Sequence, residues 1–224
     1  MDVRTNLEQI QSNIKRACEK VNRNSDEINI IGVTKYVTIE RTEEAINAGI
    51  ENIGENRVEA LTEKYRQFED KINWHFIGTL QSRKVKDVIN KVDVIHSLDR
   101  LSIAQQINNR AVKPVDCFVQ VNVSGEESKH GLSPEDVLPF IEGLNEYDKV
   151  NIIGLMTMAP HIEDEKKLRA VFKKLANLRD MIKSKNIINA PCNYLSMGMS
   201  NDYEIAIEEG ATHIRIGSKL VGSE

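Results

Sequence analysis

Paired cysteines are missing from this chain of 224 residues, which has only three cysteines in all. Cys18, Cys117 and Cys192 are widely separated and form no C-x-x-C pair. An odd, scattered set of this kind argues against a disulfide framework and against a zinc site. The five histidines show no metal-ligand spacing either. We therefore expect buried, reduced thiols, no bound metal and a cytoplasmic location.

The chain also has no long apolar run and no excess of positive charge. No stretch approaches the roughly 18 apolar residues of a membrane-spanning helix. Residues 1–20 lack the apolar segment and cleavage site of a signal peptide. The net charge of −4 gives no general attraction to nucleic acid or anionic lipid. Basic residues gather at 163–185 without the interleaved aromatic residues that stack on bases, so we expect neither a nucleic-acid partner nor a membrane.

Alternating strand and helix patterns fill most of the chain. Apolar residues at helical spacing predict a first helix over 6–22, and the apolar run that follows predicts a buried strand. From there, strand-like and helix-like segments alternate to the end. The predicted strands cover 28–33, 50–54, 74–78, 92–98, 115–123, 152–158, 193–197 and 212–217. The predicted helices between them cover 40–48, 56–68, 82–90, 99–110, 134–146, 163–185 and 201–208.

Eight strands separated by helices predict a parallel sheet. They are spaced roughly 20–35 residues apart, the size of a βαβ unit, and eight such units close a (β/α)8 barrel. We therefore predict a single α/β domain over 1–224, a TIM-type barrel with an extra N-terminal helix. The alternative is a doubly wound open sheet. Such sheets usually have fewer strands, and the G-x-G-x-x-G fingerprint of dinucleotide binding is missing after the first strand.

Lys35 lies where the first strand of such a barrel ends, on the side where barrel enzymes place their active sites. It follows Ile31 and Val33 at strand period two, so the three side chains share one face. If that face is the barrel lumen, desolvation favours the neutral amine, which can form an imine with an aldehyde. The alternative is a strand-end lysine whose amine reaches solvent, and Lys35 alone favours this alternative.

Two turns rich in small residues follow the last two predicted strands. The segment SMGMSND, residues 196–202, lies between a strand and a helix and offers backbone N–H groups to a phosphate. Gly217 and Ser218 form a second turn, and barrels commonly bind phosphate between these two loops. The alternative for each is simple turn chemistry, with Ser200 as a helix N-cap. Together the turns place a predicted phosphate site beside the amine of Lys35.

Arg215 lies in the last predicted strand between Ile214 and Ile216. If the isoleucines face the outer helices, strand alternation turns Arg215 inward. An arginine only donates hydrogen bonds, so a pyridine nitrogen facing it would be an unprotonated acceptor. A cofactor held in this way is a weak electron sink. The alternative is a buried ion pair, for instance with Glu55.

At these residues the sequence resembles the pyridoxal phosphate homeostasis protein family, whose barrels are related to the N-terminal domain of alanine racemase. The resemblance covers nearly the whole chain in order, and several matching segments are long. They are GVTKY (32–36), IGENRVEA (53–60), WHFIGTLQSRK (74–84), HSLDR (96–100), VQVNVSGEESKHGL (119–132), GLMTMAP (154–160), LSMGMSNDYEIAIEEGAT (195–212) and HIRIGS (213–218).

The resemblance implies pyridoxal 5′-phosphate as the cofactor, held as an aldimine on Lys35. It implies that Asn56 contacts the ring substituents and that Arg215 faces the pyridine nitrogen. Lys129, in the loop 124–131, resembles a family rim segment; a secondary role in cofactor handling is one hypothesis and a solvated lysine the other. Tyr36 departs from the family pattern. The residues implied to hold the phosphate are Ser196, Met199, Ser200, Gly217 and Ser218.

The resemblance further implies a monomer that buffers the cofactor or transfers it to apoenzymes without turnover. The alternative is an amino-acid racemase or decarboxylase of the barrel type. In racemase relatives a tyrosine from a C-terminal β-domain supplies the second acid or base, which two-base racemisation requires. This chain ends just after the last strand, and Tyr36, Tyr194 and Tyr203 have no clear claim to that role. We expect no catalytic residue and favour the carrier.

Overall fold

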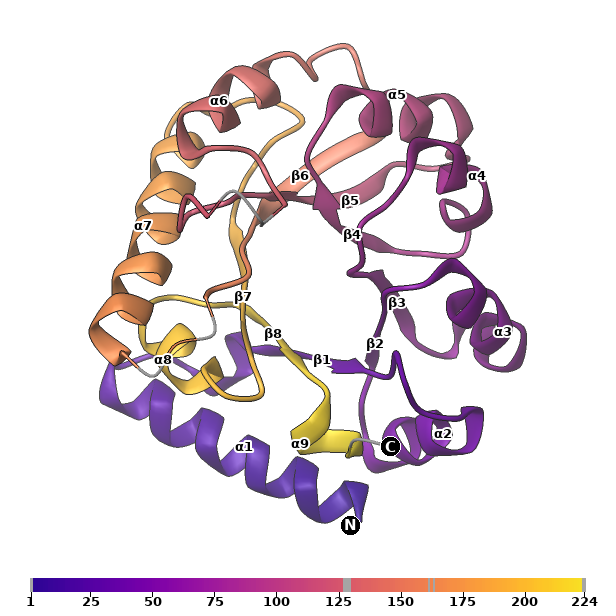
Figure 1. Cartoon of the computed structure of the whole chain (residues 1–224), viewed down its shortest axis with the longest axis vertical. Helices are drawn as coiled ribbons and strands as arrows, with labels where there is room; N and C mark the ends of the chain where they lie inside the picture. Colours follow the sequence, from indigo (N-terminus) through magenta and orange to yellow (C-terminus); the bar gives the residue numbers. More distant parts are fainter. Residues whose placement is uncertain (1, 127–129, 161, 163, 223–224) are drawn as a thin grey trace.

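Eight parallel strands form a closed barrel in the computed structural model, which describes residues 2–126, 130–160, 162 and 164–222 (Figure 1). Each strand pairs with the next, and β8 pairs with β1 to close the ring. The predicted TIM-type barrel is confirmed, and the open sheet was wrong. The strands are β1 (Asn29–Val33), β2 (Asn52–Glu55), β3 (Asn73–Phe76), β4 (Val94–Leu98), β5 (Val115–Gln120), β6 (Val150–Met156), β7 (Tyr194–Met199) and β8 (His213–Ile216).

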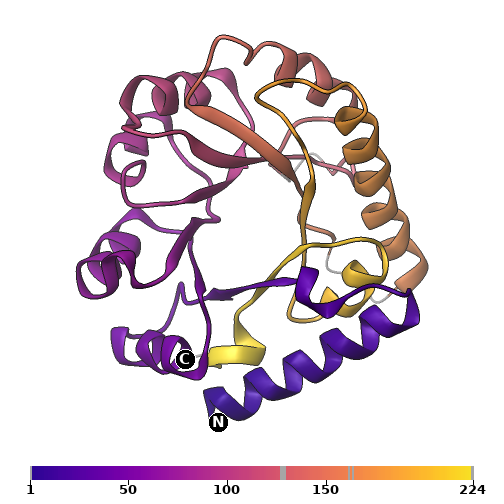
Figure 2. The same ribbon diagram turned by 180° about the vertical axis from the view of Figure 1, so that it is seen from behind.

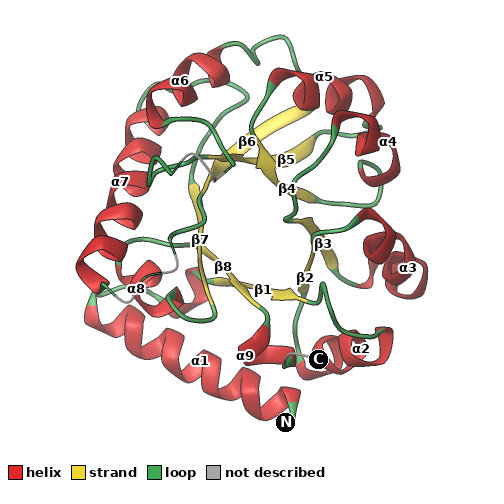
Figure 3. Ribbon diagram, viewed as in Figure 1, coloured by secondary structure: helices red, strands yellow, loops and turns green. Residues whose placement is uncertain are grey.

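Helices surround the strand ring on its outer side (Figure 3). They are α1 (Val3–Lys20), α2 (Ile39–Ala48), α3 (Val58–Phe68), α4 (Val85–Val88), α5 (Leu101–Arg110), α6 (Pro134–Glu142), α7 (Glu165–Lys183), α8 (Tyr203–Glu208) and α9 (Ser218–Val221), with 3-10 turns η1 (Ser25–Glu27), η2 (Glu69–Lys71) and η3 (Ser82–Lys84). The helix predicted over 82–90 is η3 followed by α4. The helix α9 was not predicted, because four residues are too few to show a helical period.

The extra N-terminal helix α1 is present and packs along α8 and α9 (Figure 2). Asp2 caps its start by accepting a hydrogen bond of 2.9 Å from the Thr5 backbone N–H. Its buried face includes Leu7, Ile10 and Ile14 at helical spacing. This apolar stripe covers the helices after β7 and β8, the two strands that carry the predicted phosphate turns. Within the residues that the structure describes, no helix is both long and apolar enough to cross a bilayer.

The barrel lumen is filled by apolar and histidine side chains. Phe118 packs against two imidazole rings, with centroid distances of 4.6 Å to His96 and 5.1 Å to His213. Strand register places Arg215 of β8 and Asn52 of β2 on either side of Ile31 of β1. In-register residues of neighbouring strands project to the same face of a sheet. These layers close the lumen and leave a cavity at the carboxyl ends of the strands.

Candidate functional site

A cavity of about 590 Å³ lies at the carboxyl ends of the strands. It brings together seven of the eight predicted site residues, namely Lys35, Asn56, Met199, Ser200, Arg215, Gly217 and Ser218. A second hollow, of about 810 Å³, lies at the opposite end of the barrel between the loops that precede β5, β6 and β7. Its lining has carboxylates, amides and apolar side chains but no amine, guanidinium or hydroxyl. Parallel barrels place their chemistry at the carboxyl ends of the strands, so the smaller cavity is the candidate site.

Lys35 lies two residues beyond β1 and faces this cavity together with Val33, as their spacing predicted. Its side chain is partly buried, and its Nζ atom lies 4.8 Å from the centroid of the Tyr36 ring. Arg57 lies on the same ring at 5.7 Å. Tyr36 itself is 58% exposed, so it forms part of the cavity mouth.

A buried ion pair fixes the backbone just before Lys35. Lys64 of α3 contacts the Glu55 carboxylate at 2.7 Å, and both side chains are almost fully buried. The same Nζ donates to the backbone oxygen of Thr34 at 2.5 Å, and the Thr34 hydroxyl donates to Glu55 at 2.6 Å. Glu55 therefore faces α3, and the alternative ion pair between Glu55 and Arg215 was wrong. The pair ties the exit of β1 to β2 and α3.

Asn56 follows β2 and lines the cavity. Its Oδ1 atom is buried and has no hydrogen-bond partner among the described residues. Gly78, beyond β3, holds Asn56 in place by close approach, because a Cβ at position 78 would lie 2.2 Å from the Asn56 backbone oxygen. The sequence offers little sign of this contact, which joins two strand exits that are distant along the chain.

Arg215 points inward between the buried residues Ile214 and Ile216, as alternation predicted. Its side chain donates to the Ser196 hydroxyl at 2.6 Å and to the backbone oxygen of Thr157 at 2.9 Å. Among the described residues, no carboxylate lies within ion-pair distance of it. Burial penalises the charged guanidinium and lowers the pKa of Arg215 to about 10. The cavity wall therefore carries a buried positive charge with only neutral partners.

The two turns meet beside the cavity, but not every predicted residue lies on it. Ser200, Gly217 and Ser218 line the cavity, whereas Ser196 lies beneath it within β7 and is fully buried. The backbone N–H of Met199 already donates to the Asp202 carboxylate at 2.6 Å. Asp202 is also the N-cap residue of α8, so the alternative that Ser200 caps this helix was wrong.

Other side chains contribute to the site without having been predicted. Gln120, Thr79 and Asp202 line the cavity, and His96 lies below it in contact with Ser196. Strand alternation could have indicated His96, because it follows Val94 at period two and so turns into the lumen. Lys129 and His161 lie outside the described residues.

Comparison with known proteins places the chain in a family. The family described as alanine racemase, N-terminal domain, matches residues 5–224. A pyridoxal phosphate homeostasis protein of Aquifex aeolicus is 42% identical over 220 residues, which cover 96% of each chain. The chain belongs to the pyridoxal phosphate homeostasis protein family. A member from Escherichia coli (strain K12) is 32% identical over 230 residues, which cover 99% of this chain and 97% of the relative.

Solved structures show that the similarity of this family member to known proteins extends to the three-dimensional fold. PipY of Synechococcus elongatus PCC7942, solved with pyridoxal phosphate bound, has a TM-score of 0.81 and 28% identity, covering 94% of this chain and all of PipY (100%). An alanine racemase of Clostridium difficile 630 has a TM-score of 0.77 and 18% identity, covering 98% of this chain and 56% of the racemase. At that identity the racemase shows a shared fold alone. The sequence-based resemblance to the homeostasis protein family is thus confirmed.

Proposed function

We propose that this family member binds pyridoxal 5′-phosphate in the cavity and keeps the cofactor available to apoenzymes in the cytoplasm, as a monomer and without turnover of a substrate. The names of the curated relatives and the ligand bound by PipY support the proposal. One observation of this chain carries it. One cavity is lined by an amine, by a buried guanidinium that forms no ion pair within 4 Å among the described residues, and by Asn56, whose buried Oδ1 has no partner there.

The chemistry of these groups fits the cofactor. A buried polar atom without a partner costs about 1–3 kcal/mol, so Asn56 Oδ1 favours a ligand that brings a donor. Arg215 lines the cavity and its guanidinium can only donate, so it favours a ligand that brings an acceptor. Pyridoxal phosphate brings an acceptor nitrogen for Arg215, a phenolic oxygen for Asn56 and a phosphate for the two turns. Its aldehyde condenses with a neutral primary amine and releases water.

Each residue then has a defined task. Lys35 supplies the amine, and Arg215 donates a hydrogen bond to the ring nitrogen. Asn56 contacts a ring substituent. Ser200, Gly217 and Ser218 bind the phosphate with hydroxyl and backbone N–H groups of two adjacent turns. Donation from Arg215 keeps the ring nitrogen unprotonated, which weakens the cofactor as an electron sink and favours storage over carbanion chemistry.

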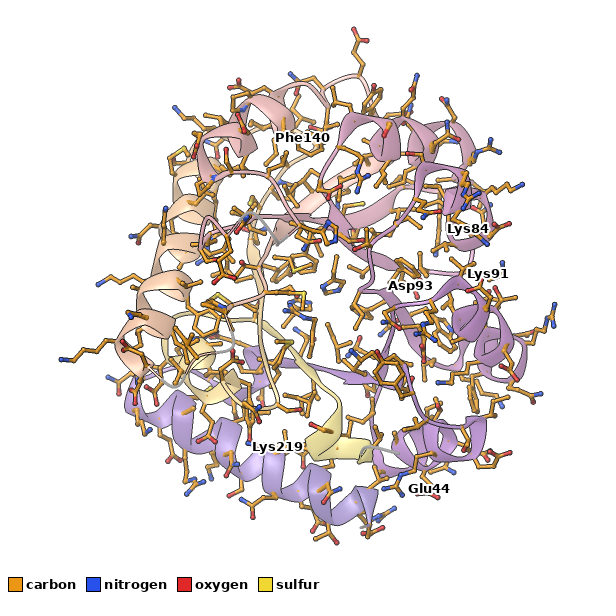
Figure 4. The ribbon with its side chains drawn as sticks, in the orientation of Figure 1. Glu44, Lys84, Lys91, Asp93, Phe140 and Lys219 are labelled. Carbon is orange, nitrogen blue, oxygen red and sulfur yellow. The ribbon has the colours of Figure 1, made fainter. Side chains whose placement is uncertain are left out.

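Chemical trapping on Lys35 tests the proposal. The purified chain should turn yellow with pyridoxal phosphate, and borohydride should fix the cofactor on Lys35, as located by peptide mass spectrometry. Lys35→Ala should lose the yellow band and the adduct. Lys219→Ala is the control, because Lys219 is an exposed residue of α9 beside α1, outside the strand ring (Figure 4). An adduct that persists in Lys35→Ala would overturn the site.

Separate assays test storage against catalysis. The loaded protein should restore activity to an apoenzyme that depends on pyridoxal phosphate. Incubation with single amino acids should leave their configuration and carboxyl groups unchanged. Multiple turnovers of racemisation or decarboxylation would contradict the carrier function and favour the enzyme alternative.

Gly78→Ala should weaken cofactor binding, because the new Cβ would lie 2.2 Å from the Asn56 backbone and must displace it. We expect an affinity about tenfold lower, since small misplacements of a site group have effects of this order. Spectroscopic titration with pyridoxal phosphate measures the change. Gly143→Ala is the control, since its Cβ would meet its nearest atom at 3.3 Å at the end of α6. Equal affinities in the two variants would contradict the role given to Gly78.

A further inference from the structure

A continuous row of hydrogen bonds runs through the barrel lumen below the cavity. It starts at Arg215, whose Nη1 lies 2.6 Å from Ser196 Oγ. Ser196 Oγ lies 2.8 Å from His96 Nδ1, and His96 Nε2 lies 2.8 Å from His75 Nδ1. His75 Nε2 lies 3.2 Å from Oδ1 of Asn52, the first residue of β2. The row joins β8, β7, β4, β3 and β2 across the lumen.

The two ends of the row fix its direction. Arg215 can only donate, so Ser196 Oγ accepts from it. At the other end the amide oxygen of Asn52 can only accept, so His75 donates from Nε2 and accepts at Nδ1. His96 must then donate from Nε2 to His75 and accept at Nδ1 from the Ser196 hydroxyl. Every hydrogen bond of the row is satisfied in this one arrangement.

The arrangement requires neutral imidazoles, and the lumen provides them. A neutral ring has one donor and one acceptor nitrogen, whereas a protonated ring has two donors. His75 and His96 are almost fully buried. Burial lowers the pKa of His75 to about 3, and burial with the nearby positive charge of Arg215 and the other histidines lowers that of His96 well below its ordinary value.

We infer that Ser196 and His96 are positioning residues that orient the guanidinium of Arg215 toward the cofactor, and that Ser196 is not a phosphate ligand. Ser196 holds one terminal nitrogen of Arg215 and Thr157 holds the other, so the guanidinium plane is fixed from two sides. Its remaining N–H donors face the cavity that it lines. The inference deepens the proposed function and depends on it, because the oriented guanidinium donates a hydrogen bond to the ring nitrogen of bound pyridoxal phosphate.

Substitutions in the row test the inference through the spectrum of the bound cofactor. Ser196→Ala should lower the affinity for pyridoxal phosphate about tenfold, as expected when a hydrogen bond to a charged group is lost. It should also shift the absorbance band of the bound cofactor, because the ring nitrogen loses an aligned donor. Ser196→Thr keeps the hydroxyl and should restore both. His96→Leu should match Ser196→Ala.

His213→Leu is the matched control. His213 also packs against Phe118 in the same lumen, but among the described residues its ring bonds only to the neighbouring Thr212. This variant should change thermal stability while leaving the absorbance band in place. A band unchanged in Ser196→Ala, or shifted equally in His213→Leu, would overturn the inference even where wild-type protein binds the cofactor on Lys35. Failure of the wild type to bind would instead overturn the proposed function.

Nitrogen-15 NMR of the ligand-free wild type gives a test that needs no folded variant. We expect the proton on Nε2 in both His75 and His96, with both rings neutral near pH 7. A proton on Nδ1 of His96, or a charged ring there, would reverse or break the row and overturn the inference.

Discussion

Between pH 6.5 and about 4, the ligand-free protein is expected to lose stability steeply as the pH falls. His75, His96 and His213 are buried in the lumen. Burial lowers the pKa of His75 to about 3 and that of His213 to about 4, and it lowers that of His96 well below its ordinary value. In the unfolded chain a histidine titrates near pH 6.5. Within this window the unfolded chain therefore binds protons that the folded chain excludes, so the free energy of unfolding falls as the pH falls.

The size of the effect follows from counting protons. Three histidines that charge only on unfolding give a slope of about 4 kcal/mol per pH unit at its steepest. Domains are commonly stable by about 5–15 kcal/mol, so we expect acid unfolding within the window. Carboxylates with lowered pKa values, such as Glu208, reduce the free energy of unfolding only at lower pH, because a free glutamate has a pKa of about 4.3. Urea unfolding followed by circular dichroism at several pH values measures the slope.

His213→Leu separates the histidines from other acid effects. Leucine keeps an apolar contact with Phe118 and Tyr194, which now pack against the imidazole, and removes one proton-binding group. The slope should fall by about 1.4 kcal/mol per pH unit, the value of one proton. An identical slope in the two proteins, or a flat profile above pH 4 in the wild type, would contradict the assignment.

The barrel could be predicted because alternation is a property of short segments. Runs such as 28–33 and 115–123 are apolar and β-branched, and helices such as α7 carry an apolar stripe over several turns. The limits of the elements were less predictable. The helix expected over 134–146 ends at Glu142, and α9 is too short to show a period. Eight repeats of one pattern determined the architecture despite these local errors.

Site residues could be predicted where alternation along a single strand determines the direction of the side chain. Alternation along β1 and β8 was enough to turn Lys35 and Arg215 inward. Contacts between strands were not predictable in this way. Ser196 of β7 and Thr157, the residue after β6, accept hydrogen bonds from Arg215. The register between β7 and β8 shifts between Ser196 and Met199.

That shift separates the two ends of the predicted phosphate segment, residues 196–202. Gly198 lies inside it with a positive φ of 93°, and a Cβ there would lie 2.7 Å from the Cβ of Ala206. Glycine lets the chain adopt this conformation and pack against α8. The residues after it, such as Ser200, reach the cavity, while Ser196 before it stays in the strand. The segment 196–202, predicted as one continuous loop, thus contains Ser196 in the lumen and Ser200 on the cavity.

Arg215→Met should lower cofactor affinity and change ligand-free stability little. The lowered pKa of Arg215 corresponds to a cost of about 3 kcal/mol for its buried charge in the ligand-free fold. Methionine removes that cost but also loses the hydrogen bonds to Ser196 and Thr157, each worth about 1.5 kcal/mol because the donor is charged. We therefore expect the stability of the ligand-free protein to stay within about 1 kcal/mol of the wild type. Affinity for pyridoxal phosphate should fall about 10- to 100-fold, because a charged donor is lost.

Arg169→Met supplies the contrast, because Arg169 of α7 is an arginine with abundant counter-charges. It pairs with Glu165 at 2.7 Å, Glu208 at 2.5 Å and Glu209 at 3.1 Å, away from the cavity. This variant should lower thermal stability and leave cofactor affinity unchanged, whereas Arg215→Met should leave thermal stability nearly unchanged and lower the affinity. Thermal unfolding measures the stability of the two variants, and spectroscopic titration measures their affinity for pyridoxal phosphate. If Arg215→Met is less stable than the wild type and binds the cofactor equally well, Arg215 is a structural residue. Nearly unchanged stability together with lost binding would mean that the chain retains this buried charge for its ligand and not for its fold.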